Sequence, residues 1–324
     1  MSKRLNNYTP PEDIIKQYGA DVLRLYLLSS PATQAQEFRF VDDDLLIFTK
    51  KLLPYFHAHK MLYECFENYK RSNQDISKFS SVDNLSKDKF DIWIINLTNK
   101  LQFDINKSIE KLELYRVPEY IFRYIDSLTN TWVKFSRDRM KDNEEPQDTI
   151  NSVNTLYRVL NKVNIILSPF MPFNTDLLHH YLKWIVHGKT VDFKSIHLTI
   201  LDNNVEYEED IIDSVDNVYQ IIEIVRGARQ EMRDKFDRPT NSPIRNMKVY
   251  LPGIYKNKID TYFDKYIKEQ CNIENLEYIY DGVKCNIEPN KGIIGKKFKR
   301  ESSEVIKLIK SSDMTDILEN KISY

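Results

Sequence analysis

The spacing of apolar side chains predicts helices over most of this chain. Apolar residues recur at helical intervals after Pro10 and Pro11, and again after the acidic run that ends at Asp44. Prolines and acidic residues favour the first turn of a helix, where amide groups are free. We predict one helix ending near Leu28, a short segment over 37–41, and a long helix from Leu45 to about residue 69.

A second helical region begins at Trp93. Apolar residues there recur at i, i+4, i+7, i+11 and i+14, which is the pattern of one buried helix face; they are Ile121, Ile125, Leu128, Trp132 and Phe135. Further helices are predicted at about 151–167, 173–186 and 214–234. The middle of the chain is therefore predicted to be a helix bundle.

The pattern changes after Pro243, where short runs rich in β-favouring residues replace the helical spacing. Strands are predicted at 247–251, 277–280 and 283–287, with helices near 259–269 and 302–309. The predicted fold class is mainly α with a small α+β C-terminal module. The predicted domains are 1–70, a polar, Ser-rich linker at 71–88, a bundle at 89–243 and the module at 244–324.

Composition limits the kinds of function. The chain has 47 Lys and Arg against 48 Asp and Glu, so a nucleic-acid partner has to be met by local basic surfaces. Only 7 glycines occur among 324 residues, and no GxGxxG or phosphate-binding loop motif is present. The three cysteines and six histidines have no metal-ligand spacing, so no metal site is predicted. No stretch suits a membrane helix, and the expected location is the cytoplasm.

One predicted helix carries a basic face opposite its apolar one. At about 100° per residue, five polar residues project to the same side: Arg123, Asn130, Lys134, Arg137 and Lys141. Evenly spaced cations on a helix can follow a phosphate backbone, which makes this face a candidate RNA-binding surface. The alternative is a solvated charged face without a ligand.

Two further basic groups are candidates. Arg226, Arg229 and Arg233 lie at i, i+3 and i+7, where they could bind phosphate or could pair with Glu223, Glu231 or the acidic 202–213 segment. A run near the C-terminus could contact RNA or a protein partner, or could simply keep the chain soluble. That run consists of Lys291, Lys296, Lys297, Lys299 and Arg300.

The start of the chain resembles a known signature. Ser2-Lys3-Arg4, followed by Tyr18-Gly19-Ala20-Asp21-Val22-Leu23-Arg24, resembles the KMSKR loop of class I aminoacyl-tRNA synthetases and the segment after it. The residue sequence of these segments most resembles that of eukaryotic-type isoleucyl-tRNA synthetases. The resemblance implies that Lys3 stabilises triphosphate charge while the amino acid attacks the α-phosphate, and that Ser2 and Arg4 complete the ATP-binding loop. The signature's leading Lys is missing, because the chain begins at its Met.

The resemblance continues along nearly the whole chain. Segments 124–139 and 167–173 look like the anticodon-binding helices of the isoleucine, valine and leucine synthetases. Segments 195–198 and 225–243 resemble isoleucine-enzyme landmarks, and 280–284 and 289–297 resemble the appended C-terminal domain of the eukaryotic form. The implied architecture is a KMSKR loop with a stem-contact-like helical segment, then an anticodon-binding helical bundle, then the α+β module.

The same resemblance implies a function. The parent enzyme would use ATP and Mg to activate isoleucine and attach it to tRNA(Ile), and this part would bind the anticodon arm. The sequence has no His-x-Gly-His and no Rossmann half, so we expect the chain alone to be inactive and to hold no cofactor stably. Expected partners are tRNA(Ile) and, through the C-terminal module, other synthetases; no membrane and no DNA are expected.

Two alternatives stay open. Valine and leucine synthetases share the bundle, so the chain could be the same region of either enzyme. It could also be a non-catalytic protein-interaction scaffold derived from a synthetase, with its helices docking another protein in place of RNA.

Overall fold

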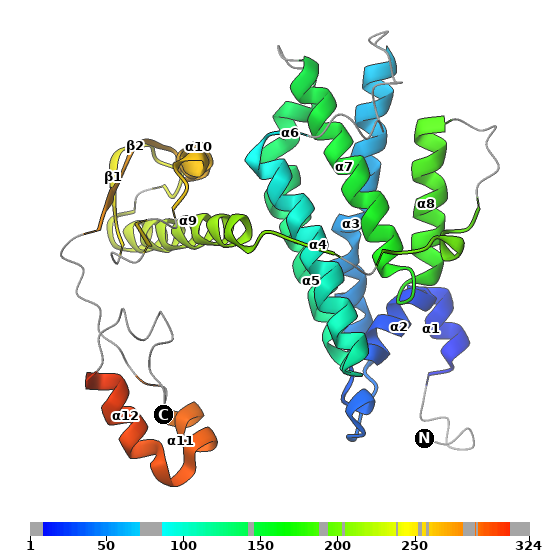
Figure 1. Cartoon of the computed structure of the whole chain (residues 1–324), viewed down its shortest axis with the longest axis horizontal. Helices are drawn as coiled ribbons and strands as arrows, with labels where there is room; N and C mark the ends of the chain where they lie inside the picture. Colours follow the sequence, from blue (N-terminus) through cyan, green and yellow to red (C-terminus); the bar gives the residue numbers. More distant parts are fainter. Residues whose placement is uncertain are drawn as a thin grey trace. The chain divides into compact units, whose positions relative to one another are not determined.

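The computed structural model describes residues 9–71, 86–141, 146–187, 194–202, 205–237, 239–251, 255–256, 259–280, 289 and 291–311. The chain forms two compact units, Met1–Ile212 and Asp213–Tyr324. Figure 1 shows that most of the described residues are helical, which confirms the predicted mainly α fold. The division that we expected at residue 243 falls inside the second unit.

The first unit opens with two short helices, α1 Pro11–Tyr18 and α2 Ala20–Ser29. The prediction of one continuous helix here was wrong. Gly19 separates the two helices with a φ of 88°, a backbone conformation that glycine adopts without steric cost. A 3₁₀ turn, Pro31–Gln34, then leads towards α3, Asp42–Arg71, which carries Pro54 within it.

The bundle is built from α3 and the helices of the next hundred residues. They are α4 Lys89–Glu110, α5 Val117–Asp126, a π-helical segment Ser127–Val133, α6 Lys134–Met140, α7 Pro146–Leu167 and α8 Pro172–His187. Helix α3 packs against α5, α7 and α8, and α4 packs against α5 and α7 (Figure 1). The largest fully buried side chains of this core include Trp132, Tyr55, Phe66 and Phe90.

The second unit contains most of α9, Glu209–Phe236, and a two-stranded sheet. Strands β1, Ile244–Tyr250, and β2, Ile273–Ile279, run parallel, with Ile244 opposite Ile273. They overlap two of the predicted strands; the third, at 283–287, lies outside the described residues. A 3₁₀ turn, Thr261–Phe263, and α10, Asp264–Cys271, replace the single helix predicted at 259–269, and α10 packs on β2.

Two helices follow near the end of the chain, α11 Lys291–Phe298 and α12 Ser302–Ser311. Helix α12 matches the last predicted helix, whereas α11 was not predicted because its sequence is short and basic. Ile294 and Val305 are the buried side chains of this pair. Across the part of the chain that the structure describes, no helix is long and apolar enough to cross a membrane.

Candidate nucleic-acid interface

The five polar residues of the predicted basic face are all exposed, but they do not form one straight row. The projection assumed an α-helix throughout, whereas Ser127–Val133 is π-helical and turns more widely. Asn130, Arg137 and Lys141 line one cleft, and Arg123 and Lys134 are not among its lining residues. Segments of π-helix occur frequently at functional sites.

This cleft has a volume of about 1040 Å³ and lies between the second half of α3 and the π-helical segment with α6. Among the residues that the structure describes, its lining includes the cations Lys60, Arg71, Arg137 and Lys141 and the carboxylate of Glu64. Apolar parts of the lining come from Pro54, Ala58, Met61, Val133 and Met140. Cations around an apolar floor suit a ligand with phosphates and flat bases.

The charged side chains near the cleft have exposed carboxylate neighbours. Lys60 lies 3.6 Å from Glu64, and Lys141 lies 3.0 Å from Asp138, whose side chain is 94% exposed. On α5, Arg123 pairs with Glu119 at 2.6 Å, again with both side chains exposed. Exposed ion pairs of this kind contribute little free energy, so phosphate groups can compete for these cations.

A cysteine is also part of the cleft lining. Burial raises the pKa of the Cys65 thiol to about 11, with a smaller contribution from Glu64. The thiol is therefore protonated near neutral pH and acts as a packing side chain in the cleft wall.

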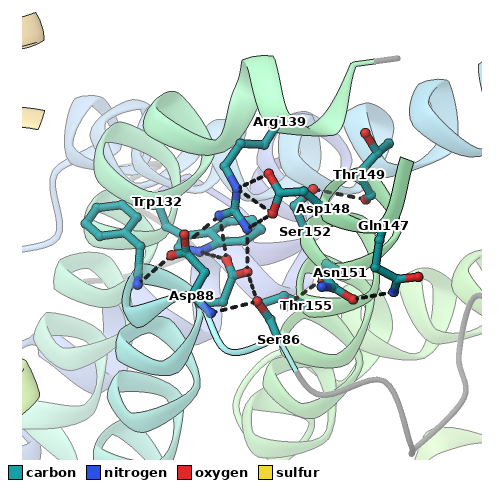
Figure 2. A network of polar contacts seen from close by, with 12 residues as sticks. Ser86, Asp88, Trp132, Arg139, Gln147, Asp148, Thr149, Asn151, Ser152 and Thr155 are labelled. Carbon is teal, nitrogen blue, oxygen red and sulfur yellow. Dashed lines mark hydrogen bonds and ion pairs between the residues drawn. The ribbon is translucent and has the colours of Figure 1, made fainter. Parts of the chain in front are cut away.

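Arg139, between Arg137 and Lys141 in sequence, points into the bundle and does not line the cleft. Figure 2 shows Arg139 beside Asp148 of α7. Its guanidinium lies 2.7 Å from the Asp148 carboxylate and 2.9 Å from that of Asp91 on α4. The Asp91 carboxylate also accepts hydrogen bonds from Trp132 Nε1, at 2.9 Å, and from Ser86. This network joins α4, α6 and α7 and so fixes the helix that presents Arg137 and Lys141.

Among the arginines of α9, Arg229 is buried against main-chain oxygens. Only 8% of the residue is exposed, and its guanidinium donates to the main-chain oxygens of Thr240, at 2.8 Å, and Ser242, at 2.7 Å. It also donates to the carbonyls of Cys271 and Asn272. These hydrogen bonds link α9 to residues 240–242 and 271–272 and give Arg229 a structural role. Its predicted phosphate contact stays a prediction.

The other two arginines of α9 are exposed. Arg226 forms the ion pair with Glu223 that we weighed as the alternative, at 3.1 Å, and also donates to Gln270 at 3.3 Å. Arg233 lies in the last turn of α9.

The remaining predicted residues divide between described and undescribed parts of the chain. Lys297 on α11 is exposed, with its amino group 5.6 Å from the centre of the Phe298 ring. The side chain of Lys296 and the ATP-loop residues Ser2, Lys3 and Arg4 lie outside the described residues. No group of histidine, cysteine or carboxylate residues in the described part could hold a metal ion.

Two cations of the cleft, Lys60 and Arg71, were missed by the sequence analysis. Both are exposed residues on α3. Nothing in their spacing marks them, because the cleft depends on α3 lying beside the π-helical segment, which is more than 50 residues away in the sequence. Their basic character in the last turns of a long amphipathic helix was the only available signal.

Comparison with known families agrees with this arrangement. Residues 91–243 match the family of anticodon-binding domains of tRNA ligases, and residues 1–39 match the class I tRNA synthetases for isoleucine, leucine, methionine and valine. Residues 91–243 are therefore similar to the anticodon-binding domains of tRNA ligases, and the start of the chain is similar to class I tRNA synthetases.

Several relatives of the chain are named as isoleucine–tRNA ligases. The chain is 29% identical over 333 residues to the cytoplasmic isoleucine–tRNA ligase of Arabidopsis thaliana, covering 98% of this chain and 27% of that protein. It is 26% identical to the cytoplasmic enzyme of Schizosaccharomyces pombe, covering 99% and 31%, and 28% identical to that of Mus musculus, covering 96% and 25%. The chain thus spans between a quarter and a third of the length of these isoleucine–tRNA ligases.

Proposed function

We propose that this chain binds the anticodon arm of tRNA(Ile) through the cleft between α3 and α6. The observation that supports this most directly is the excess of cations around that cleft, on a domain of the anticodon-binding family. Neutralised phosphates release counterions, so cations in such a cleft supply affinity. The apolar floor offers surface for unstacked bases of a single-stranded loop.

The proposal extends to the protein as a whole. It acts in the cytoplasm as an isoleucine–tRNA ligase, the activity named for its relatives. ATP and Mg would supply the activated phosphate chemistry, with Ser2, Lys3 and Arg4 in the ATP-binding loop. Binding of the anticodon arm holds the acceptor end in register with that loop, which is a positioning role. Other synthetases are proposed as partners of the C-terminal module. Arg226, Arg233, Lys296 and Lys297 are proposed as further tRNA contacts.

A salt-dependent filter-binding titration tests the RNA proposal. The chain is titrated with tRNA(Ile) and with a non-cognate tRNA, and the double variant Arg137→Glu, Lys141→Glu is compared with the parent. Each lost phosphate contact should reduce the slope of log affinity against log salt by about 0.7 to 0.9. The matched control is Lys16→Glu, on α1, whose side chain is 80% exposed and is not part of the cleft lining.

The outcomes separate the alternatives. Tighter binding of tRNA(Ile), weakened by the cleft reversals and unchanged by Lys16→Glu, supports the proposal. Preference for a valine or leucine tRNA would reassign the amino acid. Equal, weak binding that ignores the cleft reversals would contradict the RNA role and favour a protein-interaction scaffold.

A further inference from the structure

A pair of charged residues on α2 joins two regions that match different families. Asp21 and Arg24 lie within residues 1–39, the part similar to the synthetase family. Their partners lie at the α7–α8 junction, within residues 91–243, the anticodon-binding domain. The two sides of this contact are about 150 residues apart in sequence but belong to the same compact unit.

Asp21 supplies the N-terminal cap of α8 from a different helix. Its carboxylate accepts a hydrogen bond from the Asn174 amide at 2.7 Å and a longer one from the Phe173 amide at 3.5 Å. The first amides of a helix have no partner within the helix, and a cap usually comes from the residue just before it. Met171 precedes α8 and has no side-chain oxygen, so Asp21, which is 1% exposed, fills this role.

Arg24 binds the other polar groups of the same junction. Its Nη2 donates to the Pro169 carbonyl at 3.0 Å, and its Nε donates to the Phe170 carbonyl at 3.2 Å. Residues i and i+3 share one face of a helix, so a single face of α2 carries an acceptor for amides and a donor for carbonyls. This complementarity fixes both the position and the direction of α2 at the junction.

The apolar contacts of α2 do not define its position in the same way. Val22, Leu25 and Tyr26 are buried in the unit. The free energy of such contacts scales with buried area and has no direction. They therefore hold α2 against the bundle without fixing its rotation or its shift along the helix axis. Hydrogen bonds have strict distances and angles and therefore fix the rotation and the shift of α2.

We propose that Asp21 and Arg24 are positioning residues that couple the anticodon-binding bundle to the segment after the signature loop. The inference rests on the proposed tRNA function. A tRNA held in the α3–α6 cleft then stabilises the bundle. The hydrogen bonds from Asp21 and Arg24 to the α7–α8 junction transmit that stabilisation to α2. The segment that follows the ATP-binding loop is thereby held in one place when tRNA is bound.

Hydrogen exchange of the whole chain, with and without tRNA(Ile), tests this coupling. In the parent chain, tRNA should slow amide exchange in α2 by about fivefold, even though α2 does not line the cleft. Asp21→Ala should abolish that protection while tRNA affinity stays within about twofold of the parent. Asp21→Asn keeps one acceptor for the Asn174 amide and should retain part of the protection.

Arg24→Gln is the second variant, and it decides the question if Asp21→Ala does not fold. The matched control is Asp13→Asn, an exposed acid on α1 whose carboxylate lies 4.0 Å from Lys16; it should keep the full protection. If tRNA binds but protects α2 equally in Asp21→Ala and the parent, or does not protect α2 at all, the coupling is refuted and the tRNA proposal stands. If tRNA does not bind the parent chain, the proposed function itself fails.

Discussion

The two units of this chain each contain an arginine with little solvent exposure, but they neutralise its charge differently. In the bundle, Arg139 pairs with the carboxylates of Asp91 and Asp148. In the second unit, the hydrogen-bond partners of Arg229 are main-chain carbonyls, two of them at the C-terminal end of α10. The carbonyls at the end of a helix carry partial negative charge, which favours a cation there. The bundle thus depends on full charges and the second unit on dipoles.

This difference predicts different costs when a partner is removed. A side-chain ion pair that loses one member leaves a buried charge, which is expensive. Carbonyls that lose a donor stay neutral, and those near the surface can bind water, so the cost is lower. Mutations of the two arginine networks should therefore change the unfolding free energy by different amounts. Each change should be detected by a probe that lies in its own unit.

The largest effect is expected for Asp91→Ala. The side chain of Asp91 is fully buried, and the substitution leaves both Arg139 and the Trp132 amine without this acceptor. Breaking such a pair should cost the bundle about 3 to 5 kcal/mol of unfolding free energy. Urea unfolding followed by tryptophan fluorescence measures it, since Trp93, Trp132 and Trp184 all lie in the first unit.

The control for this measurement is Asp138→Ala. Its carboxylate pairs with Lys141 at 3.0 Å but is 94% exposed, so the expected change is below about 0.5 kcal/mol. Equal losses in the two variants would show that burial does not set the cost of losing an acid on this bundle.

A smaller loss of unfolding free energy is expected for Arg229→Met, which replaces the guanidinium-bearing side chain with an unbranched apolar one. Four carbonyls lose their donor, and we expect the second unit to lose about 2 to 3 kcal/mol. Amide exchange in β1 and β2 should accelerate, whereas the tryptophan transition should not move. Arg226→Gln is the control, because that arginine is exposed and pairs with Glu223; a shift of the tryptophan transition by Arg229→Met would refute the separation of the units.

These two arginines also show where sequence reasoning reaches its limit. The helix of α9 was predicted from its apolar spacing, and so were most helices of the bundle. Arg226 and Arg229 are one turn apart and look alike in sequence, yet the first is exposed and the second is buried under 240–242 and 271–272. Only the path of the chain after α9 distinguishes them.

The predictions of the helix boundaries and of the cleft residues failed for related physical reasons. The break between α1 and α2 was visible as Gly19, but the apolar spacing on both sides outweighed it in the prediction. The π-helical segment has no signal in residue type, and it rotates the face that carries Asn130 and Arg137. Lys60 and Arg71 belong to the cleft through tertiary packing, which periodicity does not encode.

The bundle should also respond to acid in a way that the second unit does not. All six histidines lie in the first unit, and His59 is buried, with Nδ1 2.9 Å from the Tyr55 carbonyl. Burial lowers the pKa of His59 to about 4, so the unfolded chain binds more protons than the folded one between about pH 6.5 and 4. The unfolding free energy therefore falls as pH falls through that window.

The expected loss from His59 is about 2 kcal/mol between pH 7.5 and pH 5. Burial also lowers the pKa of His179, which adds to the slope in the same direction. Urea titrations at both pH values, read by tryptophan fluorescence, measure the change, and His59→Gln should reduce it. If His59→Gln loses as much unfolding free energy between pH 7.5 and pH 5 as the exposed control His57→Gln, His59 is not the source of the pH dependence.

The smallest effect is expected for Glu119→Gln on α5. Glu119 pairs with Arg123 at 2.6 Å, and both side chains are about two-thirds exposed, at 67% and 69%. Unfolding free energy should change by less than about 0.5 kcal/mol, since exposed pairs contribute little. Affinity for tRNA should rise by about twofold at low salt, because the substitution removes a negative charge and releases an arginine. Glu231→Gln, which releases Lys235 on α9, is the matched control. An equal rise in both variants would reflect net charge alone, whereas a rise only in Glu119→Gln would extend the RNA-binding surface from the cleft along α5, since Arg123 does not line the cleft itself.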